Sequence, residues 1–260
     1  MVPKTADGRV LFAVPWLGKV ILGTTDTPRD DLAREPDAFA AEIEFILSEA
    51  ARYLQRAPTR ADVKSIWVGL RPLVKPLSDR GDHGDASKST KKVSREHTIL
   101  VSKSGLVTVT GGKWTTYRAM AEDVLAHCFD AKLLPFATEG VTVNLPLVGA
   151  AETATDTHAV SAPPGLHSYG TDGATISTLP GADHEIAWGL TEAMVRFAAR
   201  AEYARTVEDV LARRSRLLFL DARLALKVAP TVAAILQEET GLDPQLAAFE
   251  AMAQRYVLQN

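Results

Sequence analysis

The sequence has 260 residues, of which 46% are hydrophobic, so the chain can bury a substantial core and form one large or two modest domains. Its formal net charge of −3 argues against a nucleic-acid-binding surface as the main role. No run of about 18 apolar residues predicts a membrane-spanning helix, and the single cysteine excludes a disulfide framework within one chain.

The first predicted elements are two strands and a helix. Residues 9–15 and 19–24 are apolar and β-branched runs with a glycine between them, which predicts a hairpin. A polar run, Thr24 to Pro28, follows the second strand directly, and either a plain turn or a ligand-handling loop fits it. A helix is then predicted from about Pro36, because proline is favoured at the first helical position.

Two arginines stand at the ends of predicted strands. Residues 63–70 form an apolar strand pattern that ends in Arg71, whose following proline favours an extended backbone with the guanidinium free to project. A polar loop over residues 75–93 separates this strand from Arg95, which precedes a strand over residues 98–102. A guanidinium can bond two oxygens of a phosphate or carboxylate at once, although a solvated arginine is the simpler alternative for Arg71.

The most informative stretch joins a strand over residues 105–109 to an amphipathic helix over residues 117–128. The apolar stripe of this helix includes Tyr117, Leu125 and Cys128, and Glu122 and Asp123 are expected to face water. The residues between them are Thr110, Gly111, Gly112, Lys113, Trp114, Thr115 and Thr116. Thr115 or Thr116 is the expected N-cap. Free N–H groups at a helix start, close backbone approach at glycine and a nearby ammonium group favour an anion, whereas a plain glycine turn with a solvated lysine is the alternative.

Two familiar phosphate loops are absent. The spacing around Lys113 excludes a Walker A loop, because the next residue is Trp114. No G-x-G-x-x-G follows a strand, so the usual pyrophosphate loop of dinucleotide-binding proteins is missing. The six histidines show no metal-ligand spacing, and we expect no metal site.

The composition changes in the last third of the chain. Residues 141–143 favour a short strand. Residues 151–172 are rich in alanine, threonine, serine, glycine and proline, and we interpret them as a linker. Residues 173–260 predict an all-helical domain with short connections. Within it, residues 217–239 form a helical pattern that we expect to kink or break at Pro230.

Five motifs, in this order and spacing, resemble the C-terminal half of the FAD-dependent (aerobic, respiratory) glycerol-3-phosphate dehydrogenases. They are Gly8–Trp16, Leu22–Pro28, Gly69–Leu73, Ser94–His97 and Thr110–Arg118. The helical region resembles that family's C-terminal domain, so the resemblance covers nearly the whole chain. It implies an α+β fold: residues 1–150 as a mixed or antiparallel sheet region of an FAD-dependent oxidoreductase, without its N-terminal dinucleotide-binding unit, followed by the all-α C-terminal domain.

The resemblance implies an enzyme of glycerol metabolism. Such an enzyme oxidises sn-glycerol 3-phosphate at C2 to dihydroxyacetone phosphate, passes the hydride to FAD and then reduces quinone at a membrane surface. We therefore expect a cytoplasmic protein held peripherally at the inner membrane, with no nucleic-acid partner. The sequence predicts no particular oligomeric state. Two alternatives remain: a glycerol-3-phosphate oxidase that uses oxygen, and a non-catalytic module that binds a small anion or a partner chain.

The resemblance also implies roles for individual residues. Arg71 and Arg95 would clamp the substrate phosphate, and Lys113 would act as a catalytic and substrate-binding residue that stabilises negative charge on the C2 oxygen or the reduced flavin. The residues expected to line FAD are Gly111, Gly112, Trp114, Thr115 and Thr24. Asp26 is expected near the site. The family's dinucleotide loop and its histidine general base are missing, so we expect a fragment or truncated product that does not hold FAD tightly alone.

Overall fold

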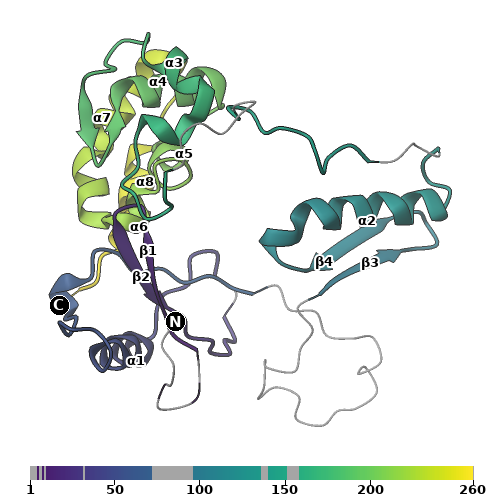
Figure 1. The fold of residues 1–260 in the computed structure, drawn as a ribbon, viewed down its shortest axis with the longest axis horizontal. Helices are drawn as coiled ribbons and strands as arrows, with labels where there is room; N and C mark the ends of the chain where they lie inside the picture. The colour runs from purple at the N-terminus through teal and green to yellow at the C-terminus, as the bar shows by residue number, and fades with distance from the viewer. Residues whose placement is uncertain are drawn as a thin grey trace. The chain divides into compact units, whose positions relative to one another are not determined.

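The structure, a computed structural model, describes residues 5, 8, 10–31, 33–71, 96–135, 140–150 and 158–259. The chain divides into two compact units whose elements are labelled in Figure 1. Unit 1 comprises Met1–Thr25, Ala33–Val68 and Val148–Asn260, and unit 2 comprises Asp26–Leu32 and Gly69–Leu147.

Unit 1 begins with the predicted hairpin, formed by β1 (Phe12–Trp16) and the antiparallel β2 (Lys19–Gly23). Leu17 and Gly18 form its two-residue turn with φ values of 48° and 78°, and positive φ at both positions is what a type I′ turn requires. Gly18 also permits a close approach, because a Cβ there would lie 3.0 Å from the ring of Trp188. The hairpin turn therefore packs against the C-terminal part of the unit.

The next helix begins later than predicted. Helix α1 (Ala40–Ala51) has Phe39 as its N-cap, whose backbone N–H donates to the carboxylate of Glu42 at 3.3 Å. That acidic side chain in the first turn satisfies an N–H group that the helix itself leaves free. Proline at position 36 therefore precedes the helix and does not start it. A short 3₁₀ turn, η1 (Arg60–Asp62), follows.

The strand predicted for residues 63–70 is wrong. The backbone is extended here, but no described strand pairs with it. Its polar groups bond to the helical region instead: the N–H of Ile66 donates to the carbonyl of Tyr256 at 2.9 Å, and the carbonyl of Lys64 accepts from the N–H of Ala222 at 3.1 Å. An apolar run can satisfy its backbone in this way without joining a sheet.

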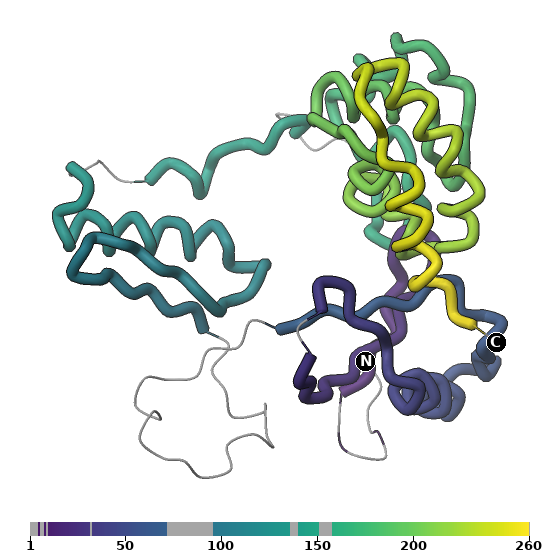
Figure 2. The backbone as a smooth tube through the Cα atoms, turned by 180° about the vertical axis from the view of Figure 1, so that it is seen from behind, coloured from purple at the N-terminus to yellow at the C-terminus, as the bar shows by residue number. Residues whose placement is uncertain are grey.

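The described part of Val148–Asn260 is mainly helical, as predicted (Figures 1 and 2). Its helices are η6 (Leu166–Asp172), α3 (Gly173–Ile176), α4 (Glu192–Ala201), α5 (Val207–Leu211), α6 (Leu217–Leu220), α7 (Ala222–Thr240) and α8 (Leu246–Gln254). A short antiparallel hairpin, β5 (Glu185–Ala187) and β6 (Leu190–Thr191), precedes α4. Threonine hydroxyls at residues 191 and 206 cap α4 and α5 by accepting from the N–H groups of Met194 and Asp209.

The break expected at Pro230 lies at Asp221 instead. Asp221 has an extended backbone, and its Oδ1 accepts from the N–H of Leu224 at 3.0 Å, so it ends α6 and caps α7. Pro230 lies within α7, which continues through it. The prediction placed the break at the proline, but the capping aspartate determines where the new helix begins.

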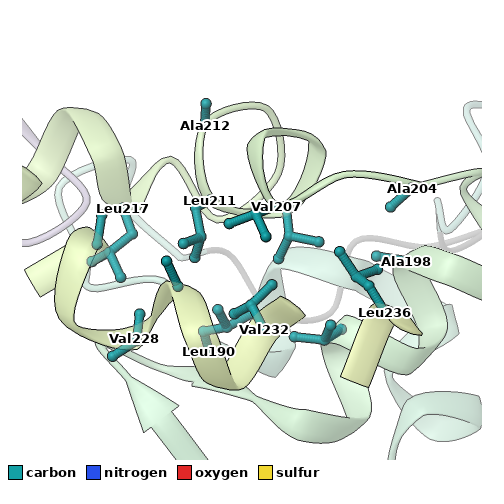
Figure 3. Close-up of a cluster of buried hydrophobic side chains, with 14 of the residues drawn as sticks. Leu190, Ala198, Ala204, Val207, Leu211, Ala212, Leu217, Val228, Val232 and Leu236 are labelled. Atoms are coloured by element: carbon teal, nitrogen blue, oxygen red, sulfur yellow. The ribbon is translucent and has the colours of Figure 1, made fainter. Parts of the chain in front are cut away.

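The hydrophobic core of unit 1 lies among the C-terminal helices (Figure 3). Its buried members extend from Ile176 to Val257, and Leu211, Leu218 and Leu236 are fully buried. Burying a leucine side chain contributes about 1.5–3 kcal/mol, so this cluster is the main source of stability. Charged groups join α4 to α7 at its edge, where the guanidinium of Arg196 donates to Glu238 at 2.9 Å and to Glu239 at 2.6 Å.

Unit 2 contains an antiparallel pair, β3 (His97–Val101) and β4 (Val107–Gly111), followed by the 3₁₀ turn η5 (Trp114–Thr116) and helix α2 (Tyr117–Asp130). The predicted strands and helix are confirmed, and Cys128 is buried as expected.

The predicted apolar stripe of α2 is only partly right. Leu125 and Tyr117, which the pattern assigned to the core, are about half exposed at 47% and 53%. Asp123, expected in water, instead has its carboxylate 2.6 Å from Nε2 of His97 on β3. Residues 141–143, for which the sequence favours a short strand, form a turn.

Candidate functional site at a strand-to-helix junction

The junction between β4 and α2 depends on its two glycines. Gly111 and Gly112 have φ values of 77° and 79°, in the left-handed region that side chains with a Cβ rarely adopt. At Gly112 a Cβ would also lie 2.6 Å from Sδ of Met120 and 3.1 Å from Cβ of His97. The glycines therefore turn the chain sharply out of the strand and let α2 pack closely on β3.

The turn leaves backbone donors open. In the described part of the chain, the backbone N–H groups of Lys113, Trp114 and Thr115 have no acceptor, and all three residues are exposed. Thr116 occupies the N-cap position of α2, as one of the two predicted candidates, but its hydroxyl donates to the carbonyl of Lys113 at 3.0 Å and does not cap the helix. Three consecutive N–H groups thus remain available to an acceptor-rich ligand.

The side chains beside these donors are also exposed. Trp114 is 85% exposed and stacks on Tyr117, with ring centroids 5.3 Å apart and planes 23° apart. Lys113 is exposed and has no carboxylate partner among the described residues. An exposed aromatic pair next to an uncompensated ammonium group suits a flat, partly anionic ligand.

Polar contacts beneath the junction hold α2 in place. The His97–Asp123 contact joins the helix to β3. Glu122 on the same helix accepts a hydrogen bond from the Thr142 hydroxyl and pairs with the guanidinium of Arg118. The Thr142 bond, and to a lesser extent the Arg118 pair, holds the pKa of Glu122 below its usual value. Sequence reasoning did not find these contacts, because Asp123 and Glu122 fall on the face that the apolar pattern assigned to solvent.

A second pair of candidate residues meets elsewhere in unit 2. Nε of Arg71 lies 3.4 Å from Oδ2 of Asp26, and the two side chains are 45% and 32% exposed. In the described part of the chain, the two terminal nitrogens of Arg71 have no acceptor. The structure therefore brings two sequence motifs together, with the guanidinium held at one edge and open at the other.

The structure gives less information on the other predicted site residues. Thr24 is exposed and precedes Asp26 by two positions in the chain. Arg95 lies outside the described residues, so the predicted grouping of Arg71, Arg95 and Lys113 stays a prediction. No group of three potential metal ligands occurs among the residues that the structure describes, and none of the described helices has the length and apolar character of a membrane span.

Comparison with known proteins identifies related families over most of the chain. Residues 1–118 match the family described as FAD dependent oxidoreductase, and residues 140–247 match the C-terminal domain of alpha-glycerophosphate oxidase.

Three mitochondrial relatives illustrate the similarity. The chain is 36% identical to glycerol-3-phosphate dehydrogenase SDP6 of Arabidopsis thaliana over 92% of this chain and 41% of that protein. It is 35% identical to glycerol-3-phosphate dehydrogenase of Schizosaccharomyces pombe, over 93% of this chain and 44% of that protein. It is 33% identical to glycerol-3-phosphate dehydrogenase of Homo sapiens, over 93% of this chain and 35% of that protein. The chain thus spans about two fifths of the length of these curated relatives.

Proposed function

Because the chain belongs to the family of FAD-dependent glycerol-3-phosphate dehydrogenases, we propose that it contributes substrate and flavin contacts to an enzyme that oxidises sn-glycerol 3-phosphate to dihydroxyacetone phosphate. FAD, when bound, supplies the hydride acceptor for C2 of the substrate. The observation that carries the proposal is the junction at Gly111–Thr115, where consecutive N–H groups and an ammonium group are open to a ligand.

The chemistry of the junction fits a flavin cofactor. FAD is rich in oxygen acceptors, and the N–H groups of Lys113, Trp114 and Thr115 are donors without partners in the described chain. Gly111 and Gly112 turn the chain sharply out of β4, which presents the N–H groups of the next three residues to a ligand. Lys113 would face the C2 oxygen and stabilise the negative charge that develops there.

The substrate phosphate would bind to arginine. Asp26 holds Arg71 through Nε, which leaves the two terminal nitrogens to bond two phosphate oxygens at once. Arg95 would complete the clamp, whereas Thr24 is proposed as a flavin contact. Two guanidinium groups match the dianionic charge of a phosphomonoester.

Electron transfer to quinone and a peripheral position at the inner membrane are part of the proposal through the family resemblance. An oxidase would instead pass the electrons to oxygen and release hydrogen peroxide. A peroxide assay run beside a quinone-reduction assay therefore separates the two acceptors.

The decisive experiment joins this chain to the N-terminal part of the Arabidopsis relative and measures oxidation of glycerol 3-phosphate with an artificial acceptor. In this chimera Arg71→Ala should lower kcat/KM by about 30-fold or more, since losing a charge-assisted bond to phosphate costs about 2–4 kcal/mol. Arg56→Ala is the matched control, because it removes an arginine that is 83% exposed and paired with Asp62. Equal activity in the two variants would remove Arg71 from the site.

The chain alone provides a second test. We expect the purified 260 residues to carry no stoichiometric flavin absorbance, because the sequence has no G-x-G-x-x-G loop for the pyrophosphate. A fully flavin-loaded protein would contradict this part of the proposal. Phosphate-dependent thermal stabilisation that Arg71→Ala abolishes, without turnover in the chimera, would favour the non-catalytic anion-binding alternative.

A further inference from the structure

A depression in unit 1, near the start of α7, gathers three cationic side chains. It has a volume of about 310 Å³ and is lined by Lys64, Asp221, Arg223, Leu224 and Lys227. The residues come from two segments, the extended chain after η1 and the first turns of α7. The depression shares no lining residue with the proposed function, and the inference does not depend on that function.

Backbone and side-chain bonds hold the two segments in register. The N–H of Ala222 donates to the carbonyl of Lys64 at 3.1 Å, which fixes that lysine beside the first turn of α7. Arg223 donates from Nη2 to the carbonyl of Leu258 at 3.2 Å, so part of its guanidinium is also anchored. Lys227 follows Arg223 by four positions and therefore projects from the same face of the helix.

Among the residues that the structure describes, the positive charge in this depression is not balanced by nearby carboxylates. Most other arginines of the helical region are paired with carboxylates, for example Arg196 with Glu239 and Arg214 with Glu202. Lys64 and Lys227, by contrast, have no carboxylate within 4.0 Å in the described part of the chain. Asp221 is the one acidic lining residue, and its Oδ1 already accepts from the N–H of Leu224. The lining therefore carries a net charge of +2, from three cations and one anion.

We propose that this depression binds a phosphomonoester group. A phosphomonoester carries about −1.5 to −2 charge at neutral pH, which matches the charge of the lining, whereas the phosphodiester of a lipid headgroup carries about half of that. The volume lies at the small end of the range for ligand pockets, about 300–1,000 Å³, so it suits a compact phosphorylated molecule. Two ammonium groups and a guanidinium supply the donors that phosphate oxygens accept.

Inorganic phosphate is the first probe, and the whole 260-residue chain is the sample. The backbone amide signals of Arg223, Leu224 and Lys227 in a ¹⁵N-labelled sample should shift saturably as phosphate is added at constant ionic strength. The double variant Lys64→Gln/Lys227→Gln should weaken binding about tenfold, which corresponds to about 1.4 kcal/mol.

Two comparisons make the result specific. The variant Lys103→Gln/Lys132→Gln removes the same charge from exposed positions of unit 2 and should leave the affinity at the depression unchanged. Arg71→Ala should also leave it unchanged, which separates this site from the proposed substrate site. If the double variant unfolds in a circular dichroism melt, Lys227→Gln alone is measured and should weaken binding by a smaller factor.

Several outcomes would overturn the proposal. Absence of saturable shifts would do so, as would equal weakening in the control variant, because that would show only general charge attraction. A sedimentation assay with phosphatidylglycerol vesicles tests whether the ligand is a lipid headgroup. Sedimentation with the vesicles, together with no response to inorganic phosphate, would assign the depression to a phosphodiester headgroup and reject the monoester.

Discussion

Asp26 and Arg71 form an ion pair between two partly exposed side chains, and the terminal guanidinium nitrogens have no acceptor among the described residues. A carboxylate at Nε restricts the rotation of the guanidinium, so less conformational entropy is lost when a phosphate binds to the other edge. Asp26 is therefore a candidate positioning residue for the proposed substrate site.

This role predicts a specific kinetic change in the chimera. Asp26→Asn should raise KM about fivefold with little change in kcat, since a partly exposed pair contributes about 1 kcal/mol. Asp26→Glu should recover part of the loss. In the double variant with Arg71→Ala the two effects should not add, because Asp26 would act through Arg71. Additive effects would mean that the two residues act independently.

Glu239 illustrates how charge at the edge of the core makes stability depend on pH. Hydrogen bonds from Arg200, and then from Arg196, hold the pKa of Glu239 below its usual value of 4.5. Because the folded-state pKa is lowered, the stabilisation is complete above pH 4.5 and is lost as the pH falls through the lower folded-state pKa.

Glu239→Gln should therefore lower the free energy of unfolding by about 2 kcal/mol at neutral pH. This is less than the cost of breaking a fully buried ion pair, because Arg200 is half exposed and solvent weakens its attraction to Glu239. Urea denaturation at a series of pH values should show the difference from the parent shrinking below pH 4.5. Glu250→Gln is the control, because Glu250 has no ion-pair partner among the described residues. A difference that is constant with pH would show that Glu239 contributes through packing alone.

At the scale of elements, local pattern predicted most of the fold. The hairpin of β1 and β2, the strands β3 and β4, and helix α2 all follow from strand alternation, turn glycines and helical periodicity close together in sequence. The glycine-rich junction was predicted for the same reason, since its geometry depends on neighbouring residues.

The failures arise where distant contacts decide the structure. Residues 63–68 look like a strand but bond to the carbonyl and N–H groups of Tyr256 and Ala222, which local pattern cannot reveal. Asp123 looks solvent-facing, yet it is paired with His97. The Asp26–Arg71 contact likewise joins separate motifs, so the sequence indicated its members but not their meeting.

The β1–β2 hairpin is attached to the helical region through Trp188. Its indole Nε1 donates to the carbonyl of Leu17 at 3.0 Å, and the ammonium of Lys19 lies 3.8 Å from the ring centroid. The N–H of Leu17 donates in turn to the carbonyl of Val160 at 2.8 Å. The tryptophan thus covers the hairpin turn and its backbone bonds.

Trp188→Ala should speed amide hydrogen exchange at Leu17 and Gly18 by roughly 5–30-fold, which corresponds to about 1–2 kcal/mol of local stability. Trp188→Phe should give an intermediate increase, because it keeps a ring but loses the N–H donor. Trp67→Ala removes an equally large side chain elsewhere in unit 1 and serves as the control. If both alanine variants accelerate exchange equally, the effect is general destabilisation.

At the scale of the whole molecule, the two units differ in how much apolar surface they bury. The large buried cluster belongs to the helices of unit 1, whereas Cys128 is the one buried hydrophobic residue among those described in unit 2. Because the described part of unit 2 has so little buried apolar surface to stabilise it, we expect unit 2 to unfold more readily than unit 1.

Calorimetry of the 260-residue chain should therefore show two transitions, with unit 2 unfolding at the lower temperature. Glu239→Gln should move only the upper transition, because that residue lies in unit 1. A single transition that coincides by calorimetry, fluorescence and circular dichroism would show instead that the units are energetically coupled.

The burial of Cys128 has a practical consequence for following this behaviour. It is the single thiol of the chain and lies buried on α2. An aromatic disulfide reagent should therefore react with it fastest when the packing around α2 opens, so the colour released over time follows the opening of that unit. The unmodified chain thus carries its own kinetic probe, with no need for an engineered label.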